Sequence, residues 1–307
     1  MKRKFAIIGI ALIFLAGICV MGYPLFSSIV NNMASRRQIE EYSETTKLMS
    51  SEETLALLQE GKDYNDSLTN NVVITDPFDV KAYEKIGAKY ENSLDVDGNG
   101  LIGYIDIPKI NVYLPISHGT TDEVLAKSAG HLQNTSFPIG GESTHSVISA
   151  HTAYPGETFF DYLTDMVEGD EFYVHVLDRT LKYEVDQIKV VLPNETDDLR
   201  IVTGEDYVTL LTCTPYSLNT HRLLVRGKRV EYDDSRYITK SASAASFGED
   251  GIFFLGYKIP YWAAAMIIAG VIFVVVILVV YFSRKSNRKN KHLSDDKKTS
   301  ENGKDGG

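Results

Sequence analysis

The sequence predicts a mainly β domain that is preceded by helices and framed by two long apolar segments. Between residues 94 and 232, short runs of β-branched and alternating residues are separated by turns rich in Gly, Pro and Asn. Several short strands with such turns are typical of a closed or nearly closed barrel. The predicted strands are GLIGYIDIP, INVYLPIS, HSVISAH, DEFYVHVLD, LKYEVDQIKVV, YVTLLTC and RLLVRGKRV.

Composition excludes several classes of protein. The 307 residues are 44% hydrophobic and 23% charged, values typical of a globular chain and not of a disordered one. The net charge of −10 argues against a nucleic-acid binder, which needs a basic face. Two cysteines allow at most one disulfide and exclude a Cys-rich metal cage.

The two apolar segments have the length of membrane spans. Residues 5–26 contain no charge, and about 20 helical residues cross the hydrocarbon core. A cleaved signal peptide is the alternative, but the apolar region is long and no A-x-A-like site follows it. Residues 261–282 are also uncharged and carry aromatic residues at both ends, as membrane helices do at the interface.

Charge around these segments predicts a topology. KRK precedes the first segment and SRKSNRKNK follows the second, so the positive-inside rule places both termini in the cytoplasm. The middle, about residues 31–258, would then lie outside the cell membrane. Cys19 falls in the first segment and Cys213 in the outer domain, so Cys213 is expected to be a free thiol.

These features predict six regions along the chain. Residues 36–70 are expected to be helical, with a possible capping box at Ser50 and Glu53 and a stop at Gly61. Their apolar stripe is thin, so they are interpreted as a membrane-proximal spacer rather than as part of a core. The predicted regions are a cytoplasmic tip and anchor (1–30), a helical spacer (31–93), the barrel (94–232), a linker (233–258), a transmembrane helix (259–282) and a basic cytoplasmic tail (283–307).

Cys213, at the end of YVTLLTC, is the candidate nucleophile. A free thiol has a pKa near 8.5, so it needs a histidine or another cation nearby to react at neutral pH. His151 ends another predicted strand and would lie at the same barrel rim, whereas alternation separates His221 from its neighbour Arg222. Each residue also has a structural interpretation, because a lone Cys is often a small buried hydrophobe.

Arg222 is the candidate for stabilising negative charge. It follows Cys213 by nine residues, and the intervening TPYSLNT contains turn residues. A hairpin-like return would bring the guanidinium beside the thiol, where its several donors could hold an oxyanion.

The combined pattern resembles the sortases. TLLTC at Thr209–Cys213 is similar to their TLxTC signature, with Arg222 in the next strand and His151 on an upstream strand end. The resemblance covers about residues 72–232. Sortases are membrane-tethered thiol transpeptidases of Gram-positive bacteria, so the resemblance implies an eight-stranded β-barrel with an N-terminal helical and lid segment and two flanking transmembrane helices. It also implies substrate contacts at Thr209 and Thr212, and no metal or cofactor.

The chain further resembles the class C branch, which polymerises pilins. The triplet Asp76-Pro77-Phe78 matches the lid motif of that branch, and the segments GHLQNTSFPIGGESTHSVISAH and TCTPYSLNTHRLLVRGKRV are similar to it. The second apolar segment and its basic tail are also features of that branch. One departure is Thr152-Ala153 after His151, where many relatives carry Arg-Gly.

The resemblance implies a mechanism and partners. Cys213 would attack the Thr–Gly bond of an LPxTG-type sorting signal, His151 would protonate the leaving amine, and Arg222 would steady the oxyanion. A lysine of another pilin subunit would then accept the acyl group. At rest, Asp76 is expected to pair with Arg222 and Phe78 to pack on Cys213.

Three other functions and one metal site compete with this interpretation. The chain could anchor surface proteins to peptidoglycan, hydrolyse peptides as a cysteine protease, or serve as a non-enzymatic membrane-tethered binding module. Calcium is a separate hypothesis, because residues 95–106 follow an EF-hand-like pattern with Asp in place of the final Glu. A polar turn before the first barrel strand explains the same residues.

Overall fold

The computed structural model describes residues 2–68, 74–79, 88–96, 98–155, 157–232, 251–254 and 257–260, and scattered positions between 265 and 282. The chain divides into two compact units, Pro24–Phe247 and the combination of Met1–Tyr23 with Gly248–Gly307. Helix α1 (Lys2–Leu48) begins in the second of these and ends in the first.

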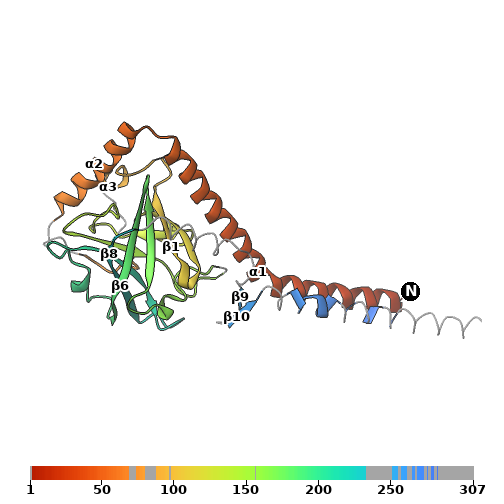
Figure 1. Ribbon diagram of the computed structural model, residues 1–307. Helices are drawn as coiled ribbons and strands as arrows, with labels where there is room; N and C mark the ends of the chain where they lie inside the picture. Colours follow the sequence, from red (N-terminus) through yellow and green to blue (C-terminus); the bar gives the residue numbers. More distant parts are fainter. Residues whose placement is uncertain are drawn as a thin grey trace, which may run out of the picture. The chain divides into compact units, whose positions relative to one another are not determined.

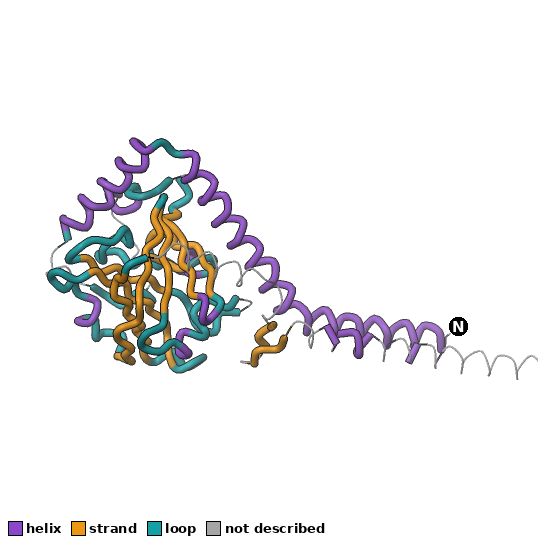
Figure 2. The backbone as a smooth tube through the Cα atoms, viewed as in Figure 1, coloured by secondary structure: helices purple, strands orange, loops and turns teal. Residues whose placement is uncertain are grey.

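The larger unit is built on a closed barrel of eight strands, as the resemblance implies (Figures 1 and 2). The strand order is β1-β2-β3-β4-β7-β8-β6-β5, and β5 pairs with β1 to close the barrel. All pairs are antiparallel except β2 with β3 and β4 with β7. The strands are β1 (Leu101–Ile107), β2 (Val112–His118), β3 (Ala129–His131), β4 (Thr144–Ser149), β5 (Glu171–Val176), β6 (Arg179–Val191), β7 (Asp206–Thr214) and β8 (His221–Val230).

Short helices fill the connections between strands. They are α4 (Asp122–Leu125) and the 3₁₀ turns η2 (Pro108–Ile110), η3 (Leu163–Asp165) and η4 (Asp197–Leu199). Helix α3 (Ala88–Glu91) precedes the barrel.

Helix α2 (Ser51–Ser67) begins at the predicted capping box but does not end where predicted. The Ser50 hydroxyl accepts a hydrogen bond from the Glu53 amide, and the Glu53 carboxylate accepts one from the Ser50 amide. The predicted stop at Gly61 is wrong, because the helix continues to Ser67. Gly61 is buried, and a Cβ there would lie 3.0 Å from Leu94 Cδ1. The glycine therefore permits close packing and does not end the helix.

The helices before the barrel contribute to its core, contrary to the interpretation as a spacer. Leu58 and Tyr64 of α2 belong to the main cluster of buried apolar side chains. Tyr42 of α1 is 2% exposed, and its hydroxyl donates to the Ile102 carbonyl at 2.7 Å and accepts from the Leu177 amide at 2.8 Å. Within the thin apolar stripe, Ile39, Tyr42 and Leu58 are buried, whereas Leu48 and Leu55 are exposed.

The smaller unit contains a hairpin of β9 (Gly251–Phe254) and β10 (Tyr257–Pro260). This hairpin lies at the end of the segment expected to be a linker. Within the described part of the chain, no helix is both long enough and apolar enough to cross a membrane. The two expected transmembrane helices are therefore not confirmed, and much of the second apolar segment lies outside the described residues.

Candidate active site

Cys213 and Arg222 are directly opposite each other in the antiparallel pair of β7 and β8. Directly opposed residues in such a pair have neighbouring side chains. Cys213 is 7% exposed and Arg222 is 8% exposed, so both lie under other groups. The predicted return of the chain after Cys213 is confirmed, and Cys213 is a free thiol as expected.

His151 follows the end of β4, which runs parallel to β7. Ser149 is paired with Leu211, and the Ala150 amide donates to the Leu211 carbonyl at 3.1 Å. Continuing this register by two residues places His151 beside Cys213. The barrel therefore gathers at one rim the three residues that the sequence singles out.

Hydroxyl groups hold the two strand ends together behind this site. The Thr212 hydroxyl donates to the Ala150 carbonyl at 2.7 Å and lies 2.6 Å from the Thr152 hydroxyl. These bonds join the residues that flank His151 to the residue that precedes Cys213. Thr152, which departs from the pattern of many relatives, is thus part of the support of the site.

The predicted substrate contacts of Thr209 and Thr212 stay predictions. Each side chain is 1% exposed. The Thr209 hydroxyl bonds His145 Nε2 at 2.7 Å, and the Thr212 hydroxyl has the internal partners given above. In this structure both threonines support the strands.

The lid triplet lies on Arg222. The Asp76 carboxylate accepts two hydrogen bonds from this guanidinium, at 2.8 Å from Nε and 2.5 Å from Nη2. Such bidentate pairing fixes both position and orientation. The remaining Arg222 nitrogen, Nη1, donates to the carbonyls of Asn219 and His221. The expected Asp76–Arg222 ion pair is therefore present.

Phe78 completes this closure. The Arg222 guanidinium lies 5.1 Å from the centre of the Phe78 ring, within cation–π range. The Phe78 ring also lies 5.3 Å from the His151 ring, and Pro77 is buried between its neighbours in the turn. The predicted packing of Phe78 on the Cys213 sulfur stays a prediction.

An apolar cluster on β4, β7, β8, η4 and the residue after β3 supports the lid. Phe78 and Ile74 pack against it. Its buried members are Leu132, Val147, Leu199, Leu211 and Leu224. The lid is thus held by one ion pair and by apolar contact.

Burial holds both reactive groups in their neutral forms. It raises the pKa of the Cys213 thiol to about 11, with a further increase from the Asp76 carboxylate, while Arg222 opposes the shift. Burial also lowers the pKa of His151, against an opposing effect of Asp122. At neutral pH the closed site therefore holds a thiol and an uncharged imidazole.

The other histidines have structural partners. His131 and His145 are 0% and 1% exposed, and each is hydrogen-bonded through both ring nitrogens. His118 bonds two backbone carbonyls, and His175 stacks on Tyr104. His221 faces the Thr220 hydroxyl.

One contact of the site was missed from the sequence. Tyr154, three residues after His151, stacks on the His151 ring with a centre distance of 5.1 Å and an interplanar angle of 16°. An aromatic residue so close in sequence to a candidate histidine was the available signal.

The region of the calcium hypothesis is only partly described. Asp106, its final position, lies within β1 and is 7% exposed, while Asp97 lies outside the described residues. Asp95 accepts a hydrogen bond from the Gly100 amide at 3.0 Å. Across the described residues, no three His, Cys, Asp or Glu side chains are grouped to hold a metal ion.

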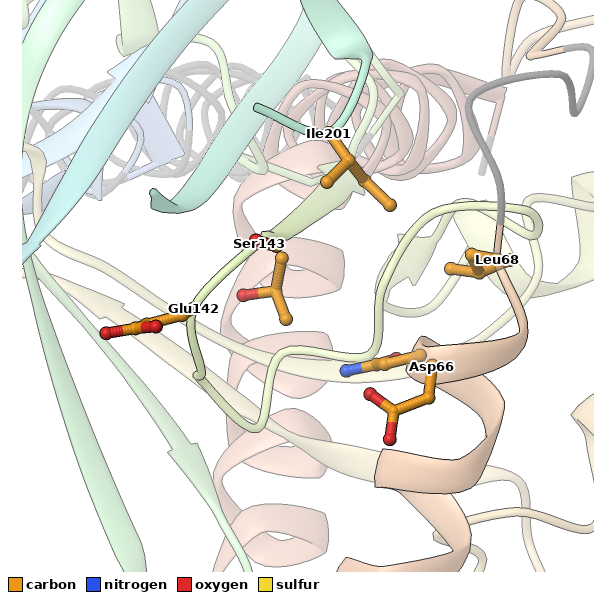
Figure 3. Close-up of a pocket in the computed structure, with 7 residues that line it drawn as sticks. Asp66, Leu68, Glu142, Ser143 and Ile201 are labelled. Atoms are coloured by element: carbon orange, nitrogen blue, oxygen red, sulfur yellow. The ribbon is translucent and has the colours of Figure 1, made fainter. Parts of the chain in front are cut away.

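A pocket of about 400 Å³ lies at the start of β4, the end of that strand opposite to His151 (Figure 3). Thr144, the first residue of β4, lines it together with Asp66 at the end of α2 and Glu142 in the loop before β4. Since His151 follows the other end of β4, this pocket is separate from the candidate site.

Comparisons with known proteins agree with this geometry. The family model described as "Sortase domain" matches residues 105–230. Sortase C-1 from Streptococcus pneumoniae is 46% identical, and the match covers 64% of this chain and 100% of that chain with a TM-score of 0.61. The pilus-related sortase C of Group B Streptococcus is 47% identical, with 64% and 97% covered and a TM-score of 0.57. Sortase D of Bacillus subtilis is 29% identical over 146 residues, which are 47% of this chain and 71% of the relative.

The chain belongs to the sortase family and is a cysteine-type transpeptidase. Its structural neighbours at 39–47% identity are sortases C, so the resemblance to that branch is confirmed.

Proposed function

We propose that the chain joins pilin subunits through an acyl-enzyme on Cys213. The observation that carries this proposal is the closed lid, in which Asp76 and Phe78 both contact Arg222 beside the thiol. Its similarity to the pilus-related sortase C of Group B Streptococcus supports it. The substrates would be pilins with an LPxTG-type sorting signal and an acceptor lysine.

In the first half-reaction, the Cys213 thiolate attacks the carbonyl carbon of the threonine in the sorting signal. Arg222 stabilises the oxyanion through its N–H donors once Asp76 has left. The Thr–Gly C–N bond then breaks, and the His151 imidazolium gives its proton to the leaving glycine amine. A thioacyl bond on Cys213 and a neutral imidazole remain.

In the second half-reaction, a lysine amine of another subunit attacks the thioester. Neutral His151 accepts the proton that the amine must lose, since an ammonium has no free electron pair. The C–S bond breaks, an isopeptide bond forms, and the thiolate and imidazolium are regenerated. Dividing one difficult step into two easier ones is the general advantage of covalent catalysis.

The lid would keep the site inactive until a substrate arrives. In the closed site the thiol is protonated at neutral pH and the guanidinium donors are occupied by Asp76. Withdrawal of the lid removes the Asp76 charge and part of the burial, and both changes lower the pKa of Cys213. Nucleophile and oxyanion donors would therefore become available in the same event.

We place the enzyme in the cell membrane on the basis of its two apolar segments. Their basic flanks favour cytoplasmic termini and a catalytic domain on the outer surface. This arrangement suits substrates that emerge from the membrane, and it involves no nucleic acid.

Mass spectrometry of the full-length chain in detergent micelles tests the proposal. The enzyme is incubated with an LPxTG-containing peptide and a lysine-bearing pilin fragment. Wild type, Phe78→Ala and Cys213→Ala are compared. We expect a thioacyl adduct on Cys213 followed by an isopeptide product, more of both with Phe78→Ala, and neither with Cys213→Ala.

Two other outcomes have distinct meanings. An adduct that transfers to a cell-wall peptide amine but not to the pilin lysine would favour anchoring of proteins to peptidoglycan. No adduct even with Phe78→Ala would contradict the proposed function.

A further inference from the structure

Among the residues that the structure describes, none forms with the His151 ring the hydrogen bond that usually orients a catalytic histidine. In most such sites the second ring nitrogen bonds a carboxylate or a carbonyl, which fixes the tautomer and the ring plane. Among the described residues, neither His151 ring nitrogen has such a partner, and the ring's neighbours are two aromatic side chains. An imidazole that passes a proton between fixed atoms needs another source of orientation.

The two aromatic neighbours differ in how they are attached. Phe78 belongs to the lid and would leave with it. Tyr154 lies in the loop after β4, is half-buried, and packs at 5.8 Å against the ring of Phe159, which is 1% exposed in the main core. When the lid opens, Tyr154 is the aromatic contact that His151 keeps.

The loop that carries Tyr154 is fixed at both of its ends. The Phe160 amide donates to the His151 carbonyl at 3.1 Å, and the Ala153 amide donates to the Asp161 carboxylate at 3.0 Å. These bonds close the loop without any help from the lid. The position of the Tyr154 ring is therefore determined by the barrel.

We propose that Tyr154 is the positioning residue that orients the His151 imidazole in the open enzyme. Its ring is nearly parallel to the imidazole at 5.1 Å, so stacking restrains the tilt of the histidine. The electron-rich face of the ring also attracts the imidazolium that must form during each cycle. The kinetic effect expected from this inference rests on the proposed function. The titration of the His151 imidazole does not, because it can be measured without turnover.

Other charges around His151 act from different elements. Asp122, at the start of α4, favours the imidazolium, while burial of the ring opposes it. The Phe78 ring contacts both Arg222 on β8 and His151. Asp76 neutralises the charge of Arg222 in the closed site. Cys213 lies beside His151 on β7. Tyr154 is uncharged, so its effect on His151 can be separated from theirs by changing the ring alone.

The test compares Tyr154→Leu with Tyr154→Phe, both in a Phe78→Ala background that removes the lid ring. Leu keeps an apolar side chain against Phe159 but has no aromatic face. Phe keeps the ring, and the Tyr154 hydroxyl has no hydrogen bond to the described residues that would be lost. We expect Leu to lower kcat for transfer to lysine about tenfold with KM unchanged, and Phe to stay within about twofold of the parent.

Two pH measurements add readouts that a loss of stability would not produce. The acylation rate falls as pH rises through the pKa of His151, and this limb should move about half a pH unit lower with Leu but not with Phe. NMR titration of isotope-labelled histidine, assigned with His151→Gln, should show the same displacement of the His151 pKa. The NMR result tests the inference even if no acyl-enzyme forms.

Tyr216→Leu is the matched control. Tyr216 is three residues after Cys213 and 55% exposed, so its loss should change neither kcat nor the pKa of His151. Equal kcat and equal pKa for Tyr154→Leu and the parent would overturn the proposal. So would an equal loss with Tyr154→Phe, because the ring would then not be the cause.

Discussion

His145 and His151 lie six residues apart at the two ends of β4, and their surroundings are opposite. His145 bonds the Arg200 carbonyl at 2.8 Å and the Thr209 hydroxyl at 2.7 Å, so both ring nitrogens are occupied. His151 contacts two aromatic rings and, among the described residues, has no hydrogen bond to its ring nitrogens. His145 is held by hydrogen bonds at both ring nitrogens, whereas no described residue occupies the ring nitrogens of His151, which the proposed proton transfer requires to be accessible.

The same contrast extends along β7, the neighbour of β4. At its start, the Asp206 carboxylate accepts hydrogen bonds from the Tyr183 hydroxyl and the Gly141 amide. At its end, the lid triplet lies on Arg222, the residue paired with Cys213, and is held there by one ion pair and by apolar contacts. Hydrogen bonds between barrel residues hold the first rim, whereas the second rim is held by a separate segment, the lid, which under the proposed function gives way to a substrate.

Replacing each histidine with glutamine tests this contrast most strongly. His151→Gln should lower transpeptidation on the order of 10²–10⁴-fold, because a general acid–base group is lost, with little change in thermal stability. His145→Gln should instead lower the free energy of unfolding by about 1–3 kcal/mol, since buried partners lose their bonds, and leave the folded enzyme active. Peptide-transfer assays and thermal unfolding of both variants provide the check. A stable, active His151→Gln enzyme would contradict the assignment.

Acid should destabilise the folded protein through three buried histidines, of which His145 lies near the start of β4. Burial lowers the pKa of His145 to about 4, of His131 to about 3 and of His175 to about 4. Between these values and about 6.5 the unfolded chain binds protons that the folded chain does not, so the free energy of unfolding falls as pH drops through this range. Urea unfolding at several pH values measures the slope. His145→Gln should reduce that slope by up to about 1.4 kcal/mol per pH unit, and an unchanged slope would count against a neutral buried His145.

The lid should respond to loss of its ion pair. Asp76→Asn removes a charge that raises the pKa of Cys213 and frees Arg222, so alkylation of the thiol at pH 8 should become about tenfold faster. Asp186→Asn is the control, because Asp186 forms a similar bidentate pair with Arg226 on the same strand β8. Equal alkylation rates in the two variants would show that the Asp76 pair does not restrain the thiol.

The smallest expected effect concerns a single bond at the first rim. Tyr183→Phe removes the hydroxyl that donates to Asp206 at 3.0 Å but keeps the ring stacked on Phe172. We expect the free energy of unfolding to fall by about 1 kcal/mol and the melting temperature to fall by about 2–4 °C, with activity unchanged. Calorimetry measures the shift, and reduced transfer activity would mean that the two rims are coupled.

The barrel strands were largely readable from the sequence because alternation and turn residues mark them. Strand β3 was missed, since Ala129–His131 has three residues and all are buried, which leaves no alternation to detect. The sequence could predict that the site residues lie together, because the positions of the strand ends agree with a family signature. It could not predict the contacts that support these residues, because the Tyr154 stack and the Thr152–Thr212 bond depend on loop geometry that no periodic pattern encodes.

The role of Gly61 also could not be predicted, because a helix-ending glycine and a close-packed glycine look alike in a sequence. Only the position of Leu94 against α2 distinguishes them. Similarly, the thin apolar stripe of α1 gave no sign that Tyr42 reaches two separate parts of the barrel.

The Tyr42 hydroxyl has a practical consequence for anyone who shortens this protein. It connects the Ile102 carbonyl on β1 with the Leu177 amide after β5, across the pair of strands where the barrel closes. The matched family region starts only at residue 105 and omits it. A fragment trimmed to that boundary would lack both Tyr42 and Ile102, and the Leu177 amide would lose its hydrogen-bond partner. A soluble catalytic fragment should therefore start before Ser35, so that the buried turns of α1 remain attached.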